Sequence, residues 1–262
     1  MSPFEVGRDI VSAVKTSDHV QQLQAHGVAL ADAADRAGLD AAVPTCPDWQ
    51  VRDLLGHIGR VHRWATSFVG TGRTQPPTGD DEMAETPDDD ELLGWFRRGH
   101  ESLVRTLTET KPDVECWAFL PAPSPLAFWA RRQAHETAIH RLDAESATGT
   151  VTSFAPEFAV DGIDELLLGF FSRPRGRLVS DPPVSLGLRT TDSDVAEAWT
   201  IAIGSGSREV TRGVARGDCI VSGPASELYR LLWNRRDVDD IDVAGDRALL
   251  DLWRDKAKVS WS

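Results

Sequence analysis

The sequence predicts a two-domain protein in which an all-α four-helix bundle precedes a small α+β domain. Between Asp18 and Ala147, four segments carry apolar residues at helical spacing, and no alternating strand pattern separates them. After Gly149 the pattern changes to short alternating runs separated by Gly, Ser and Asp turns. We therefore expect the bundle to span residues 1–155 and the second domain residues 156–262, with a helix over 156–172 as the joint.

The bundle helices have recognisable start signals. Thr86 offers a hydroxyl N-cap to the third helix, and Pro87 fills its first position. Gln50 is a poor cap for the second helix, which leaves Asp48 or Asp53 to cap it. The four helices are expected over Asp18–Ala37, Val51–Val69, a stretch that starts at Thr86, and Leu126–Ala147, with Gly70–Glu85 and Lys111–Ser124 as connections.

The second domain begins with a helix and continues with short strands. Pro174 is expected to end the helix Pro156–Phe171. The alternating runs predict antiparallel strands over Val184–Thr190, Ala198–Ile203, Glu209–Thr211 and Cys219–Ser222, and two further helices over Pro224–Trp233 and Asp246–Ala257.

Composition excludes several functional classes. Lys and Arg number 28 against 41 Asp and Glu, so the net charge is −13. Nucleic acids and anionic membranes bind basic surfaces, so we expect neither as a partner. No apolar run approaches 18 residues, and the N-terminus lacks a signal-peptide pattern. Together with three cysteines at no disulfide or metal spacing, this predicts a cytoplasmic protein.

One helical pair carries potential chemistry. Glu136 and His140 are four residues apart, so they fall about 40° apart on a helix. Such a pair is commonly solvated, but with His57 of the second helix it would form a two-His, one-carboxylate metal site. His62 and His135 are the competing ligands, although each is also placed to be a core histidine.

Three motifs resemble a known family. They are VPTCPDWQVRDLLGHIGRVHRW over residues 43–64, RRQAHETAIHRLD over residues 131–143, and GDCIVSGPASELYRLLWNR over residues 217–235. Together they resemble the mycothiol-dependent maleylpyruvate isomerases of actinobacteria. The resemblance implies a DinB-like bundle, and a C-terminal domain similar to sterol carrier protein. It also implies a divalent metal, zinc or alternatively nickel, on His57, Glu136 and His140.

The resemblance also implies a reaction class. A metal-bound mycothiol thiolate would either isomerise a maleylpyruvate-like substrate from cis to trans or transfer its sulfur to another electrophile. The expected partners are thus a small electrophile and a low-molecular-weight thiol, in a monomer or homodimer. Two alternatives stay open: a metal-assisted hydrolase with water in the open position, and a non-catalytic module that binds an apolar ligand.

Residues around the triad have two interpretations each. Asp143 and Arg132 are candidates to orient His140 or Glu136, or they form a solvated pair. Trp64 and Trp129 either line the metal pocket or fill the core. Cys46 precedes a helix and is either a reactive thiol or a packed one.

Overall fold

The chain folds into two compact units, Met1–Thr152 and Ser153–Ser262. The computed structural model describes residues 14–77, 83–173, 176–192 and 196–259. The N-terminal segment assessed for a targeting signal, the middle of the 70–85 connection and Pro174 lie outside the described residues. Within the described ranges, no helix combines the length and the apolar character needed to cross a membrane.

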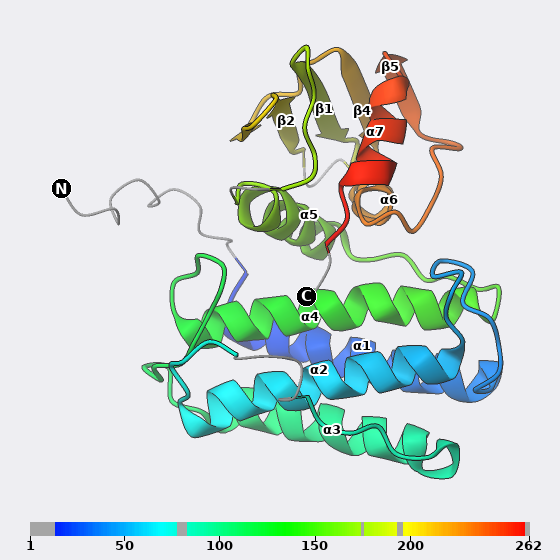
Figure 1. Cartoon of the computed structure of the whole chain (residues 1–262), viewed down its shortest axis with the longest axis vertical. Coiled ribbons are helices and arrows are strands. Elements are labelled where there is room, and N and C mark those ends of the chain that lie inside the picture. Colours follow the sequence, from blue (N-terminus) through cyan, green and yellow to red (C-terminus); the bar gives the residue numbers. More distant parts are fainter. Residues whose placement is uncertain (1–13, 78–82, 174–175, 193–195, 260–262) are drawn as a thin grey trace. The chain divides into compact units, whose positions relative to one another are not determined.

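The first unit is the predicted four-helix bundle (Figure 1). Its helices are α1 (Thr16–Ala37), α2 (Val51–Thr71), α3 (Asp89–Glu109) and α4 (Pro125–Ser146). α1 packs mainly against α4 and α2 mainly against α3, while α1–α3 and α2–α4 contacts close the bundle. The contact between α2 and α4 brings side chains of these two helices together.

The helix starts differ in part from the expectation. α2 begins with a capping box, in which the backbone N–H of Gln50 donates to Asp53 Oδ2 at 2.9 Å. Asp53 is therefore the capping acid. The predicted Thr86 cap of α3 is wrong, because the helix starts at Asp89 with Asp88 in the N-cap position. Thr86 instead packs against α2, where its methyl group faces Gly56.

The bundle has two kinds of core. At one end, aliphatic side chains of α1 and α2 pack together with Phe96 of α3 and Ala144 of α4. At the other end, aromatic rings are in edge and stacked contact, and the Trp129 indole N–H donates to the Trp117 carbonyl at 2.8 Å. The aromatic members are Trp64, Phe68, Trp117, Phe119, Phe128 and Trp129.

The second unit is the predicted α+β domain. It contains α5 (Pro156–Asp164), a π-helical turn η2 (Glu165–Phe170), β1 (Val184–Thr190), β2 (Ala198–Ile203), β3 (Arg208–Arg212), β4 (Cys219–Gly223), α6 (Ala225–Leu232), β5 (Asp242–Gly245) and α7 (Ala248–Lys256). The strand order is β3-β2-β1-β4-β5. The prediction of antiparallel strands is wrong for β1 and β4, which pair in parallel because β4 reaches β1 by a crossover from β3 and not by a hairpin.

Three features of this unit were not predicted. The helix expected over 156–171 changes to π-helical hydrogen bonding at Glu165. β5 is an additional strand that pairs antiparallel with β4, and α7 starts at Ala248, two residues later than expected. β5 has four residues with Asp and Gly at its ends, too short for a visible alternation.

Candidate metal centre

α4 carries two of the three predicted metal ligands. Ser124 starts this helix, since its Oγ accepts a hydrogen bond from Ala127 N at 3.1 Å. The later turns place Glu136 Oε1 3.4 Å from His140 Nε2. Their side chains are only 4% and 9% exposed, which excludes the solvated pair that the sequence left open.

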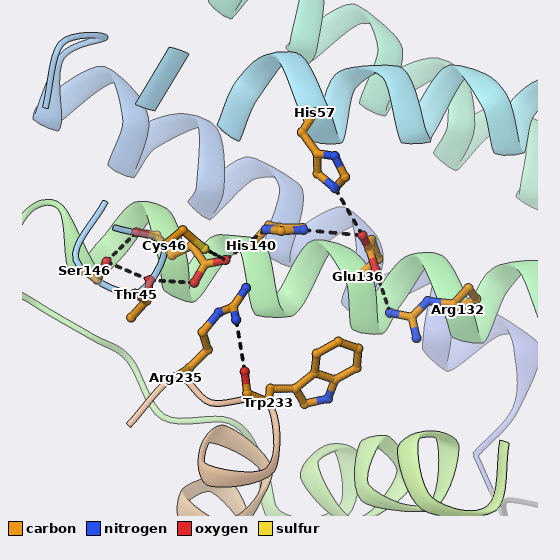
Figure 2. A network of polar contacts seen from close by, with 10 residues as sticks. Thr45, Cys46, His57, Arg132, Glu136, His140, Ser146, Trp233 and Arg235 are labelled. Carbon is orange, nitrogen blue, oxygen red and sulfur yellow. Dashed lines mark hydrogen bonds and ion pairs between the residues drawn. The ribbon is translucent and has the colours of Figure 1, made fainter. Parts of the chain in front are cut away.

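α2 brings His57 to the same carboxylate oxygen. His57 Nε2 lies 3.5 Å from Glu136 Oε1, and one ligand atom of each of the three residues lies within 4.8 Å of the others. Figure 2 shows His57 and His140 pointing toward Glu136 from two directions. Ligand atoms about 2.1 Å from a tetrahedral ion lie about 3.4 Å apart. The separations of 3.5 and 3.4 Å from Glu136 Oε1 are close to that spacing.

The charges of the site suit a cation. Burial opposes ionisation of Glu136, but hydrogen bonds from His140 and His57 and the charge of Arg132 outweigh it and hold the pKa well below its ordinary value. Burial likewise opposes the charged form of His140. Hydrogen bonds to Asp143 and Glu136 outweigh this and raise the His140 pKa to about 9. The carboxylate is therefore ionised, which is the form that binds a metal ion.

Arg132 forms an ion pair with one carboxylate oxygen of Glu136. Its Nη2 donates to Oε2 at 2.9 Å from one turn earlier on α4, and its side chain is fully buried. The other oxygen, Oε1, is the one that faces His57 and His140. The arrangement offers a single carboxylate oxygen to an ion.

Asp143 supports His140 from the opposite side. Asp143 Oδ2 lies 2.9 Å from His140 Nδ1, and its side chain is fully buried. Since a carboxylate can only accept, Nδ1 donates and Nε2 is directed toward Glu136. The contacts expected for Arg132 and Asp143 are therefore both present, and they are buried rather than solvated.

The loop before α2 adds residues that the sequence interpretation missed. The Trp49 ring stacks on His140 at a centroid distance of 6.0 Å and lies tilted 5.1 Å from His57. Thr45 Oγ1 donates to Asp143 Oδ1 at 2.6 Å. Both belong to the 43–64 motif that carries the family resemblance, and that motif was the available signal.

The competing histidines lie elsewhere. His62 is fully buried, and its Nε2 lies 2.9 Å from Thr137 Oγ1. His135 is also fully buried and contacts His19 edge-to-face at 6.0 Å. Neither belongs to the cluster of His57, and both are fully buried.

Trp64, Trp129 and Cys46 have contacts typical of packed side chains. Trp64 and Trp129 belong to the aromatic core. The Cys46 thiol donates to Asp143 Oδ2 at 3.6 Å, so it supports the same carboxylate as Thr45. The three cysteines are free thiols.

Comparison with known families identifies the chain. A model described as the mycothiol maleylpyruvate isomerase N-terminal domain matches residues 20–145, and one described as the MDMPI C-terminal domain matches residues 157–252. The chain belongs to the mycothiol-dependent maleylpyruvate isomerase family. All three candidate ligands of this isomerase-family chain lie within the N-terminal match.

Solved structures agree with this family in fold. A crystal structure of the mycothiol-dependent maleylpyruvate isomerase superposes with a TM-score of 0.60 at 14% identity, covering 88% of this chain and 93% of that chain. A histidine-to-alanine mutant of that isomerase gives a TM-score of 0.61 at 12% identity with the same coverage. The comparison with curated proteins found no match.

Proposed function

We propose that this member of the isomerase family is a metal-dependent enzyme that uses a low-molecular-weight thiol, with mycothiol as the expected thiol. The convergence of two imidazole nitrogens on one buried carboxylate oxygen carries the proposal. His57, Glu136 and His140 would hold a divalent ion, for which zinc is the expected identity and nickel the alternative.

The protein groups have distinct tasks in this proposal. Glu136 supplies the negative charge, and Arg132 keeps it oriented with one oxygen available. The His57 side chain is 20% exposed, the most open of the three ligands, so a small molecule would approach from its side. When bound, the ion would supply a Lewis acid that favours the thiolate form of a coordinated thiol at neutral pH.

The family favours cis–trans isomerisation of a maleylpyruvate-like substrate, and thiol transfer to another small electrophile is the related reaction. Both begin with attack of the thiol on an electrophilic carbon, and only isomerisation requires the thiol to leave again. A cytoplasmic location is part of the proposal, since the reduced state expected for the free cysteines persists there.

Metal content tests the site. Purified protein is expected to bind about one zinc ion per chain, and His57→Ala is expected to lose it. His62→Gln is the matched control, because His62 is a buried histidine of the same helix outside the triad. Protein that binds no zinc, or a His57→Ala variant that binds it normally, would overturn the metal site.

Spectroscopy and product analysis test the reaction. On a cobalt-substituted sample, mycothiol is expected to produce a thiolate-to-metal absorption band, and maleylpyruvate is then expected to be isomerised. The band without isomerisation would favour thiol transfer. No band would favour the hydrolase alternative, in which water occupies the open position.

A further inference from the structure

The support of His140 extends beyond Asp143 to a loop nearly one hundred residues away. Val43–Trp49 lies in the connection between α1 and α2, and two of its side chains contact Asp143. We infer that Thr45 is a positioning residue of the metal centre, which acts through Asp143 to orient His140; this inference rests on the proposed metal site.

The two carboxylate oxygens of Asp143 have different partners. Oδ2 lies 2.9 Å from His140 Nδ1, and Oδ1 accepts the Thr45 hydroxyl at 2.6 Å (Figure 2). A carboxylate bound at one oxygen alone can rotate about its Cβ–Cγ bond, whereas donors at both oxygens hold its plane. Thr45 therefore contributes to the direction in which Asp143 presents Oδ2 to the imidazole.

The contact is short, and its acceptor carboxylate is buried. A hydroxyl that donates to an ionised carboxylate at this distance forms a charge-assisted hydrogen bond, which is stronger than a neutral one. Asp143 is fully buried, so no water replaces Thr45 without reorganisation. The Ser146 hydroxyl of α4 has two alternative acceptors, Thr45 Oγ1 at 3.2 Å and the Asp143 carbonyl at 2.7 Å.

The loop itself is held by its own backbone. Val43 N donates to Trp49 O at 2.9 Å, Cys46 N donates to Val43 O at 2.9 Å, and Trp49 N donates to Cys46 O at 2.8 Å. These bonds restrict the loop between its ends, so Thr45 is presented from a fixed frame. The same frame sets the Trp49 ring against the imidazoles of both histidine ligands.

The consequence concerns the tautomer of His140. Only an imidazole with its proton on Nδ1 presents the Nε2 lone pair to an ion. Removing the hydrogen-bond partner of a metal-bound histidine typically weakens metal binding by about 10- to 100-fold. We expect Asp143→Asn to weaken zinc binding within that range, and Thr45→Val, one contact further out, to weaken it by about 3- to 10-fold.

The experiment compares zinc dissociation constants by competition with a chromophoric chelator. Thr45→Val removes the hydroxyl at nearly constant volume, and Thr45→Ser, which restores it, is expected to bind zinc within about 2-fold of the unchanged protein. Thr66→Val is the matched control, because the Thr66 hydroxyl donates only to a carbonyl of its own helix. It is expected to leave zinc affinity unchanged.

A second measurement reports on orientation without activity. Long-range ¹H–¹⁵N spectra of the zinc-loaded protein are expected to show His140 with its proton on Nδ1, and Thr45→Val is expected to broaden or shift these signals. Equal zinc affinity and equal spectra in Thr45→Val and the unchanged protein would overturn the inference while the metal site stands. An unchanged protein that binds no zinc would overturn the proposed function itself.

Discussion

The Arg132 guanidinium lies 2.9 Å from Oε2 of Glu136, and both side chains are buried one helical turn apart on α4. In the metal-free protein, Arg132 compensates the negative charge of Glu136 inside the bundle. Breaking one partner of a buried pair typically costs about 3–5 kcal/mol, because the other charge is left without compensation.

Arg132→Met is therefore expected to destabilise the metal-free protein by about 3 kcal/mol, since His57 and His140 still compensate Glu136 in part. Urea unfolding at neutral pH measures this. In the Glu136→Gln background, which has no charge to compensate, the same substitution is expected to cost much less. Equal costs in the two backgrounds would show that the effect comes from lost packing of the arginine.

Zinc is expected to stabilise the folded bundle, because its proposed ligands come from both α2 and α4. At a free concentration 100 times the dissociation constant, the gain is about 2.7 kcal/mol. Thermal unfolding with zinc and with a chelator measures the gain as a difference in Tm. Glu136→Gln is expected to unfold at the same temperature in both conditions, and a retained shift would contradict the assignment of this ligand.

The stability of the metal-free protein is expected to fall as the pH rises above neutrality. The His140 pKa is about 9 in the folded protein against 6.5 for the unperturbed group. A raised pKa contributes stability that is fully present below the unfolded value and lost as the pH rises through the folded one. The expected loss is on the order of 3 kcal/mol.

Urea unfolding between pH 6 and about pH 10 measures this loss, which spans the two pKa values of His140. His140→Gln is expected to lack it. Burial lowers the pKa of His62 and of His100, so the contributions of these two histidines change only below about pH 6.5, at the lower edge of this window. A His140→Gln variant with the same slope as the unchanged protein would contradict the prediction.

Close packing between α1 and α3 makes Gly27 sensitive to substitution. A Cβ at this position would meet His100 Nε2 at 2.1 Å, and this nitrogen lies 3.0 Å from the Leu23 carbonyl. Gly27→Ala is expected to displace the imidazole and cost about 1–3 kcal/mol in urea unfolding.

Gly70→Ala is the matched control for this substitution. Gly70 lies in the last turn of α2, and the nearest atom to an added Cβ is Thr106 Cγ2 at 3.6 Å, an ordinary contact. Here alanine is expected to add up to about 1 kcal/mol, because glycine loses more backbone entropy on folding. A change of the same sign at both positions would show that helix propensity, and not contact with His100, decides the effect.

Most of the fold was predictable because helical and strand periodicities are local. Apolar spacing located α1, α2 and α4 to within a few residues, and alternation located β1, β2 and β4. The errors fall where local signals compete. Several acidic residues follow Thr86, and Asp88 takes the N-cap position that the threonine was expected to fill. β5 is defined by its pairing with β4, and its four residues are too few to show a strand pattern in the sequence.

The sequence by itself determined the family and the pairing of Glu136 with His140, since four residues of helix put both side chains on one face. His57 joined them through the resemblance. Only the tertiary structure decided that Thr45 supports Asp143 from 98 residues away and that Trp49 lies against both imidazoles. Spacing within a helix follows from its geometry, whereas contacts between distant segments depend on how α2, α4 and the loop before α2 pack together.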